Sequence, residues 1–503
     1  MTDFLSQTIG YPRIGRRREL KRALEGYWAG KLSETDLVRT QRQVEEDGWR
    51  AQRQAGISRV GIGDTSLYDP VLDWSIRFGA VPERHRRRKG LARTFALARG
   101  AEGAPALELT KWFDTNYHYL VPEIDGSWEA APDFDEFLDS LRRGAEFFEG
   151  RAVPIVLGPL TFLRLSRLQI EIREALARLL PAYLELVRRL RDLRPSISEV
   201  QLHEPALALP QAEEDRPLYE LAYGQLGRAG LPIHLVTYFD DLGESFAWVS
   251  RLPVAGIGLD FTRGDNLSLL RRHDWPEGTV LSAGAVDSRS VWRLEPEPAI
   301  RLLEELRERI PVRVSTSSSL QFLPYTVQAE TTLPASLRDV LAFADEKLNE
   351  VRLLASYLSG EDVTGAWADA RARWGRFRSE VPARSEIRER LRTLGPRDFA
   401  RALPYPERRP AQIPLPAFPT TTIGSFPQTR EIRTLRRRLK DGQLGDQDYR
   451  SGIDSAIRHT IEVQEELGLD VLVHGEFERS DMVEYFAERL DGFAITENGW
   501  VQS

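Results

Sequence analysis

Residues 8–12 are TIGYP and residues 422–427 are TIGSFP, so one short motif occurs twice in the chain. In both copies isoleucine precedes a glycine, and a strand that ends in glycine lets the backbone approach a ligand closely because glycine has no Cβ. Further residues recur at a constant offset of 412 (442 − 30): Gly30 with Gly442, Leu32 with Leu444, Asp36 with Asp448, Gln52 with Gln464, Gly56 with Gly468, Gly63 with Gly475, and acidic Asp64 with acidic Glu476. Seven matches at one offset indicate an internal duplication, so the fold that begins near residue 8 is predicted to begin again near residue 422.

Eight short apolar runs predict the fold of the first part of the chain. Such runs are typical of strands buried on both faces of a parallel sheet. They are TIGYP (8–12), VGIGD (60–64), PIVLGP (154–159), VQLHEP (200–205), IHLVTYF (233–239), GIGLDF (256–261), VLSAGAVD (280–287) and VRVSTSSSL (312–320). Amphipathic stretches such as residues 173–193 fall between them and predict helices. The sequence therefore predicts an α/β protein with a complete N-terminal (β/α)8 TIM-like barrel, and a doubly wound sheet is the alternative.

The chain divides into three predicted segments. Residues 1–400 form the first barrel, with an insertion over residues 65–150 and additional helices after the eighth strand. Residues 404–419 contain six prolines in sixteen positions, a density that is incompatible with a helix or a central strand. We therefore expect a stiff proline-rich linker over residues 401–420, followed by the incomplete start of a second barrel over residues 421–503.

The second copy contains the equivalents of only the first two strands, TIGSF (422–426) and VLVHGE (471–476), and then a third apolar segment at 492–503. A barrel of parallel strands cannot close on two or three strands, because open edges leave backbone N–H and C=O groups unpaired. We therefore expect the chain to be a C-terminally truncated form of a protein with two duplicated (β/α)8 barrels.

The composition argues against several classes of protein. The 69 Lys and Arg against 76 Asp and Glu give a formal net charge of −7, without the basic excess typical of nucleic-acid binding. The chain has no cysteine, so it can form neither a disulfide nor a metal–thiolate bond. The N-terminus lacks a secretion-signal pattern, and no apolar run approaches the ~18 residues that cross a bilayer. We expect a cytoplasmic monomer that binds neither nucleic acid nor a membrane.

Long stretches of the chain resemble the cobalamin-independent methionine synthases. They are TIGYPRIGRRRELKRALEGYWAG (8–30), LTKWFDTNYHYLVPE (109–123), LSAGAVDSRSVWR (281–293), PTTTIGSFPQTREIRTLR (419–436) and the last 37 residues, 467–503. The resemblance implies methyl transfer from 5-methyltetrahydropteroyl-polyglutamate to homocysteine, giving methionine. It also implies two face-to-face barrels, of which the C-terminal one carries the chemistry with zinc and without cobalamin.

A basic stretch, RRRELK at residues 16–21, follows the first predicted strand. Loops after strands form the ligand face of a barrel, and arginine and lysine there can bind carboxylates such as those of a polyglutamate tail. A solvated helix start is the alternative for such a charge run. The resemblance implies that the folate tail contacts Arg18, Glu19, Leu20 and Lys21, together with Lys111 of the stretch LTKWF.

The second motif copy supplies the predicted amino-acid site. Gly424 would allow close backbone approach, Ser425 offers a hydroxyl, and Glu476 is a carboxylate at the end of the second predicted strand. A tight strand-end turn is the alternative reading of the motif. The resemblance implies that Ile423, Gly424 and Ser425 hold homocysteine or methionine, with Glu476 on its ammonium group.

The resemblance implies that the zinc ligands and the general acid lie beyond residue 503, so we expect no metal ligands in this chain and no activity from it alone. A non-catalytic folate-polyglutamate binding protein built on the first barrel is an alternative. A glycosidase with Glu204 and Asp260 as its carboxylate pair is a second alternative, for which nothing else in the sequence argues. In the QLHEPAL stretch (201–207), His203 occupies the position of a substrate-binding aspartate of the family, and we expect Glu204 to be structural.

Overall fold

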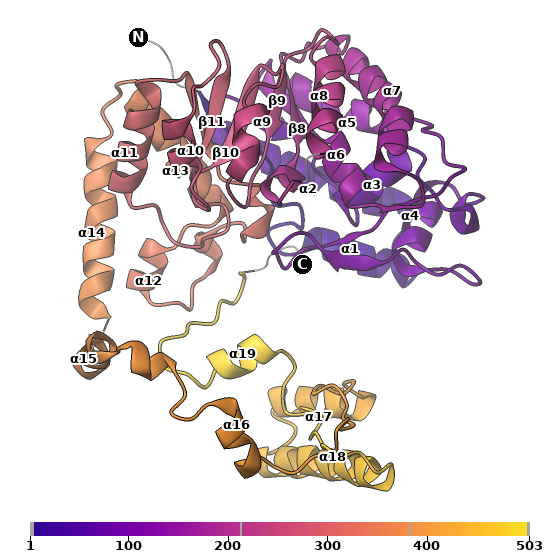
Figure 1. The fold of residues 1–503 in the computed structure, drawn as a ribbon, viewed down its shortest axis with the longest axis vertical. Helices are drawn as coiled ribbons and strands as arrows, with labels where there is room; N and C mark the ends of the chain where they lie inside the picture. Colours follow the sequence, from indigo (N-terminus) through magenta and orange to yellow (C-terminus); the bar gives the residue numbers. More distant parts are fainter. Residues whose placement is uncertain (1–4, 212–213, 382–383, 500–503) are drawn as a thin grey trace. The chain divides into compact units, whose positions relative to one another are not determined.

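Eight parallel strands form one sheet in the part of the chain that the computed structural model describes, residues 5–211, 214–381 and 384–499 (Figure 1). They are β1 (Ser6–Gln7), β2 (Val60–Ile62), β6 (Ala152–Leu157), β8 (Val200–His203), β9 (Ile233–Val236), β10 (Gly256–Asp260), β11 (Val280–Val286) and β12 (Val312–Thr316). Their order is β1-β12-β11-β10-β9-β8-β6-β2, and every neighbouring pair is parallel. A parallel bridge between Gln7 and Arg59 joins the two ends, with the Thr8 N–H donating to the Arg59 carbonyl at 3.0 Å. The sheet therefore closes into a barrel.

Seven of the eight predicted runs contain or overlap a strand of the barrel, and the first prediction is wrong. Residues 8–12 lie outside strand β1, which covers only Ser6–Gln7. The chain turns away at Gly10, whose φ of +135° is open to glycine but strained for other residues. A Cβ at that position would lie 2.3 Å from the Ser319 hydroxyl oxygen, so the motif TIGYP forms a tight loop at the mouth of the barrel.

Helices cover the outside of the barrel (Figure 1). They are α1 (Glu19–Trp28), α2 (Glu34–Gln54), α5 (Asp135–Phe148), α6 (Pro159–Arg164), α7 (Ile172–Arg191), α8 (Asp215–Leu226), α9 (Phe246–Val249), α10 (Asn266–Arg272), α11 (Pro296–Arg307) and α13 (Ala344–Leu358). The helix predicted at residues 173–193 is confirmed as α7, which buries the apolar face given by its spacing of leucines. Helix α2 begins with a capping box in which the side chains of Ser33 and Asp36 satisfy each other's backbone N–H groups.

The segment between β2 and β6 adds small elements beside the barrel. They are α3 (Pro70–Arg77), α4 (Gly90–Arg99), β3 (Leu109–Lys111), β4 (His118–Leu120) and β5 (Glu123–Ile124), which pairs with β7 (Arg167–Leu168). Strands β3 and β4 form an antiparallel hairpin in which Lys111 lies opposite His118.

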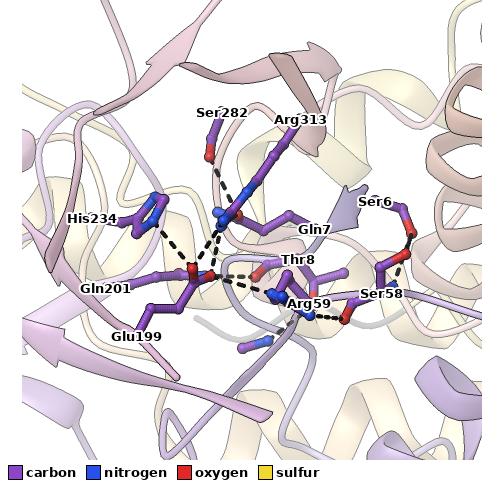
Figure 2. A network of polar contacts seen from close by, with 11 residues as sticks. Ser6, Gln7, Thr8, Ser58, Arg59, Glu199, Gln201, His234, Ser282 and Arg313 are labelled. Carbon is purple, nitrogen blue, oxygen red and sulfur yellow. Dashed lines mark hydrogen bonds and ion pairs between the residues drawn. The ribbon is translucent and has the colours of Figure 1, made fainter. Parts of the chain in front are cut away.

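A buried polar network crosses the barrel interior (Figure 2). The Glu199 carboxylate accepts hydrogen bonds from both terminal nitrogens of Arg313, at 2.6 and 2.9 Å, and lies 3.2 Å from Nε2 of His234. Gln201 donates to the carbonyl of Thr8 at 3.2 Å. These contacts connect residues in or next to strands β1, β8, β9 and β12 through polar groups.

Residues 381–496 form a second compact unit. Its helices are α15 (Ser385–Thr393), α16 (Tyr405–Arg408), α17 (Arg430–Lys440), α18 (Asp446–Glu466) and α19 (Met482–Ala487), whereas α12 (Ala335–Val340) and α14 (Thr364–Glu380) belong to the first unit. The prediction that residues 404–419 contain no helix is wrong for the single turn of α16. Pro406 sits in the first turn of that helix, where its missing N–H would have no partner within the helix anyway.

The predicted strands at residues 422–426 and 471–476 are also wrong. The two segments run parallel but share only one bridge, between Ser425 and Gly475. In residues 384–499, no third segment pairs with either of them, so no ladder extends beyond this bridge. Residues 500–503 of the third predicted segment lie outside the described residues. Among the helices of the described ranges, each is too short or too polar to span a bilayer.

Candidate functional site

A groove lies between helix α1 and the β3–β4 hairpin and has a volume of about 380 Å³. We call it the α1 groove. Its lining combines basic groups with aromatic and aliphatic side chains: Ile14, Arg18, Lys21, Leu24, Glu25, Trp28, Leu67, Tyr68, Leu109, Tyr117 and His118. Basic groups above an apolar floor can bind a ligand that carries carboxylates on a flexible chain.

Arg18 and Lys21 come to the groove because of the way helix α1 begins. Arg18 is the N-cap residue of the helix, with φ of +63°, and its N–H donates to the Gly15 carbonyl at 3.0 Å. Lys21 follows three residues later, and residues at this spacing lie on the same helix face. The neighbouring Arg22 is exposed and is not among the residues that line the groove. The helix start therefore presents two cations to one surface.

The other predicted tail contacts are placed differently. Leu20 is buried, with 1% of its surface exposed, in a small apolar cluster under helix α1. Glu19 accepts a hydrogen bond from the Arg17 N–H at 2.9 Å and stabilises the turn before the helix. Lys111 is exposed in β3 directly opposite His118, a groove residue, and opposite residues of an antiparallel pair project from the same face. The structure thus places Arg18 and Lys21 in the groove lining, and Lys111 outside that lining but opposite the groove residue His118.

Nine of the eleven groove residues were not predicted from the sequence, among them Trp28, Tyr68 and His118. The Nδ1 atom of His118 lies 3.0 Å from the Asn116 carbonyl, so this nitrogen carries a proton and Nε2 stays available on the other side of the ring. The stretch LTKWFDTNYHYLVPE contains both Lys111 and His118. Folding this stretch into a hairpin would have placed the two residues on one face, because paired residues of an antiparallel hairpin project to the same side.

The four residues of the predicted amino-acid site lie together in the second unit. The Ser425 hydroxyl donates a hydrogen bond to the Glu476 carboxylate, and a Cβ at Gly424 would lie 2.9 Å from an oxygen of the same carboxylate. Ile423 is 78% exposed. Glu476 also forms an ion pair with Arg479, and the hydrogen bonds from Arg479 and then Ser425 hold the pKa of Glu476 below its ordinary value. A ligand ammonium group would therefore have to displace Arg479.

The two units repeat the same local geometry. Helix α2 spans Glu34–Gln54 and helix α18 spans Asp446–Glu466, which is the same 21-residue range displaced by 412 (446 − 34). In each unit the glycine of the motif faces an acidic side chain, since a Cβ at Gly10 would lie 3.1 Å from Oδ2 of Asp64. The offset found in the sequence therefore also relates whole structural elements.

The carboxylates of the glycosidase alternative are engaged in internal hydrogen bonds. Glu204 is fully buried and accepts hydrogen bonds from the N–H groups of Leu160 and Thr161, at 3.1 and 2.6 Å, and from the Tyr223 hydroxyl at 3.1 Å. These N–H groups belong to the first turn of α6, so Glu204 caps that helix. Asp260 accepts from the N–H groups that follow it, beginning with Thr262 at 2.8 Å. Both contact patterns agree with structural roles.

The closed parallel sheet and the groove beside it define the class of (β/α)8-barrel proteins. Comparison with known families identifies the member of this class. Residues 5–311 match the model described as "Cobalamin-independent synthase, N-terminal domain", and residues 418–503 match "Cobalamin-independent synthase, Catalytic domain". The chain belongs to the cobalamin-independent methionine synthase family.

Two relatives that are about half identical to this chain share the same name. The chain is 50% identical over 505 residues to the 5-methyltetrahydropteroyltriglutamate–homocysteine methyltransferase of Thermosynechococcus vestitus, covering 99% of this chain and 66% of the relative. It is 49% identical over 500 residues to the protein of that name from Trichodesmium erythraeum, covering 99% and 67%. The chain thus spans about two thirds of the length of these relatives. A B12-independent methionine synthase structure from Shewanella sp. W3-18-1 aligns with a TM-score of 0.49 at 14% identity, covering 71% of this chain and 98% of that one.

Proposed function

We propose that this chain takes part in methyl transfer from 5-methyltetrahydropteroyl-polyglutamate to homocysteine, and that its complete barrel binds the polyglutamate tail of the methyl donor. The observation that carries the proposal is the α1 groove, in which Arg18 and Lys21 share one face of a helix and Lys111 projects from the facing hairpin. The names of the relatives support the reaction. They do not favour the alternative of a non-catalytic folate-binding protein.

The groove chemistry suits a chain of carboxylates. Arg18 offers a planar fork of N–H donors that can hold a carboxylate through two parallel hydrogen bonds, and Lys21 and Lys111 add mobile point charges. Trp28 and Tyr68 supply apolar surface for the methylene groups between the carboxylates. Each added glutamate should therefore strengthen binding until every cation of the groove is paired with a carboxylate.

The second unit fits the start of a second barrel, as the repeated helices and the repeated glycine–carboxylate contact suggest. On this proposal Ile423, Gly424, Ser425 and Glu476 form part of the site for homocysteine. Glu476 would exchange its ion pair with Arg479 for one with the α-ammonium group of the amino acid. The proposed domain limits are residues 1–400, 401–420 and 421–503.

Zinc activates thiols in enzymes that methylate them, because bound thiolate is a better nucleophile than a free thiol. Across residues 5–211, 214–381 and 384–499, no group of three or more His, Asp or Glu side chains could hold a metal ion, and the sequence has no cysteine. The residues present therefore do not fit a zinc site.

Isothermal titration calorimetry of the chain with triglutamyl and monoglutamyl folate tests the tail site. We expect the triglutamyl form to bind more tightly, and Lys21→Gln to weaken it by about 1 kcal/mol, a typical value for a partly exposed charge pair. Arg22→Gln is the matched control, because Arg22 is the next residue of the same helix and lies outside the groove. Equal affinities for the two folates, or equal losses in both variants, would refute the tail site.

A further inference from the structure

A second cavity, of about 70 Å³, lies at the mouth of the first barrel, and the family resemblance assigns it no ligand. We call it the mouth cavity. Its lining comes from the carboxyl ends of strands β1, β2, β6, β8, β9 and β12, from helix α3, and from Trp112 and Tyr117 between strands β3 and β4. Ligands of barrel proteins bind at this end of the strands. Tyr117 lines both the mouth cavity and the α1 groove, and the other lining residues of the two differ.

Asp64 places a negative charge in the mouth cavity, and no side chain in residues 5–211, 214–381 and 384–499 forms an ion pair with it. Its Oδ2 accepts a hydrogen bond from the Tyr11 N–H at 2.9 Å, and its side chain is half-buried. Arg13 is near enough to lower the pKa of Asp64, yet its guanidinium donates to the carbonyls of Ser66 and Tyr68. Burial, the larger effect, raises the pKa of Asp64 to about 6, so the carboxylate is ionised at neutral pH.

The basic residue of the lining is already occupied. Arg77 lies 3.9 Å from the Asp73 carboxylate, and its guanidinium lies over the rings of Trp74, at 4.7 Å, and Phe137, at 4.5 Å. An anion in the cavity would have to break these contacts and would meet the charge of Asp64. The charges of the lining therefore disfavour an anionic ligand.

The remaining polar and aromatic groups favour a cation. Burial lowers the pKa of His203 to about 3, so its ring stays neutral. Its Nε2 lies 3.0 Å from the Gln201 side-chain oxygen, which leaves Nδ1 as an acceptor, 3.4 Å from the Tyr238 hydroxyl. Trp112 adds an aromatic ring to the lining, and ring faces attract ammonium groups.

We propose that the mouth cavity binds the ammonium group of a small primary amine, with Asp64 as its counter-ion and the aromatic side chains around it. An apolar cavity of about 150 Å³ holds one benzene molecule. The mouth cavity is about half that size, so it has room for a head group of two to four heavy atoms. This site is separate from the proposed tail groove and does not depend on the methyl-transfer reaction.

Saturation-transfer difference NMR of the full chain with methylammonium chloride tests the proposal, because weak binding of a methyl-bearing probe is visible by this method. We expect saturation of the methylammonium methyl group, none for neutral methanol of similar size, and none for formate. Asp64→Asn should weaken methylammonium binding at least tenfold. Asp139→Asn is the control, since Asp139 is an exposed carboxylate paired with Arg142 on the surface. Thermal unfolding of both variants checks that they are folded.

A second variant keeps the test decisive if Asp64→Asn does not fold. Thr65→Trp places a large side chain at a half-buried position of the same lining and keeps the carboxylates of Asp64 and Asp73. It should abolish the methylammonium signal and leave the affinity for triglutamyl folate unchanged. Equal saturation of methanol and methylammonium, or an unchanged signal in the folded variants, overturns the proposal.

Discussion

Glu199→Gln should destabilise the first barrel strongly, because Glu199 is the acceptor at the centre of the buried network (Figure 2). Glu199 is 5% exposed and binds Arg313 through two hydrogen bonds of 2.6 and 2.9 Å, while His234 lies 3.2 Å from the same carboxylate. Glutamine keeps the shape and removes the charge. It leaves the Arg313 guanidinium buried without a counter-ion.

The size of the effect follows from the pKa of Glu199. Burial by itself raises this pKa, but the hydrogen bonds from His234 and Arg313 outweigh burial and lower it from 4.5 to about 2. A difference of about 2.5 pKa units corresponds to about 3 kcal/mol of folding free energy. Because the folded pKa is depressed, this stability is fully present above about pH 4.5 and is lost as the pH falls toward 2. Removing one partner of a buried pair costs about 3–5 kcal/mol, so the two values agree.

Urea unfolding at neutral pH, followed by far-UV circular dichroism, measures the free energy of unfolding without adding salt. Glu305→Gln is the matched control, because Glu305 binds Arg271 with nearly the same two-bond geometry, at 2.6 and 2.7 Å, on the surface. We expect a loss of about 3 kcal/mol or more for Glu199→Gln and below about 1 kcal/mol for Glu305→Gln. Equal losses in the two variants would refute the reasoning that burial of the pair sets its contribution.

Two further predictions concern the barrel. Gly10→Ala should destabilise it by about 2–4 kcal/mol, because the new Cβ combines a strained φ of +135° with a clash 2.3 Å from the Ser319 hydroxyl oxygen. Gly365→Ala, at an open helical site, should be neutral or stabilising in the same urea-unfolding assay, and a Gly10→Ala variant as stable as the native protein would contradict the loop geometry. Glu204→Gln should change the pH dependence of stability. Burial raises the pKa of Glu204 from 4.5 to about 7, so its contribution in the native protein is full below about pH 4.5 and is lost as the pH rises through 7. Relative to the variant, the native protein should therefore lose about 3 kcal/mol between these pH values. Parallel urea-unfolding profiles for the two proteins across that range would show the assignment to be wrong.

Local sequence patterns predicted the barrel because each of its strands is buried on both faces and therefore appears in the sequence as a short run of apolar residues. Helix α7 was predictable for the same reason, since its apolar face recurs with the helical period. The first strand was misplaced because pairing with β12 and the turn at Gly10, which the run TIGYP does not reveal, decide where it ends. The second copy formed no strands in the described residues because a strand needs partners as well as an apolar run.

The candidate site was predictable only in part, from its residue types. The basic stretch RRRELK, directly after the first predicted strand, indicated cations at the ligand face of the barrel. The inward position of Leu20 depends on packing, and the position of Lys111 opposite His118 depends on the pairing of the β3–β4 hairpin. The pairing of Glu476 with Arg479 was likewise not evident from the motif TIGSFP.

The sequence by itself determined that the chain is a barrel protein whose first part is repeated. The spacing of apolar residues is a local property, and a repeat is found by comparing the chain with itself, so neither needs the tertiary structure. The same offset of 412 (446 − 34) separates the first residues of helices α2 and α18, Glu34 and Asp446. Only the tertiary structure decided which charges come together: Glu199 binds Arg313 inside the barrel, Arg18 and Lys21 line one groove, and Asp64 lines the mouth cavity. Interaction energies between charges depend on separation and burial in space, and neither can be read from position along the chain.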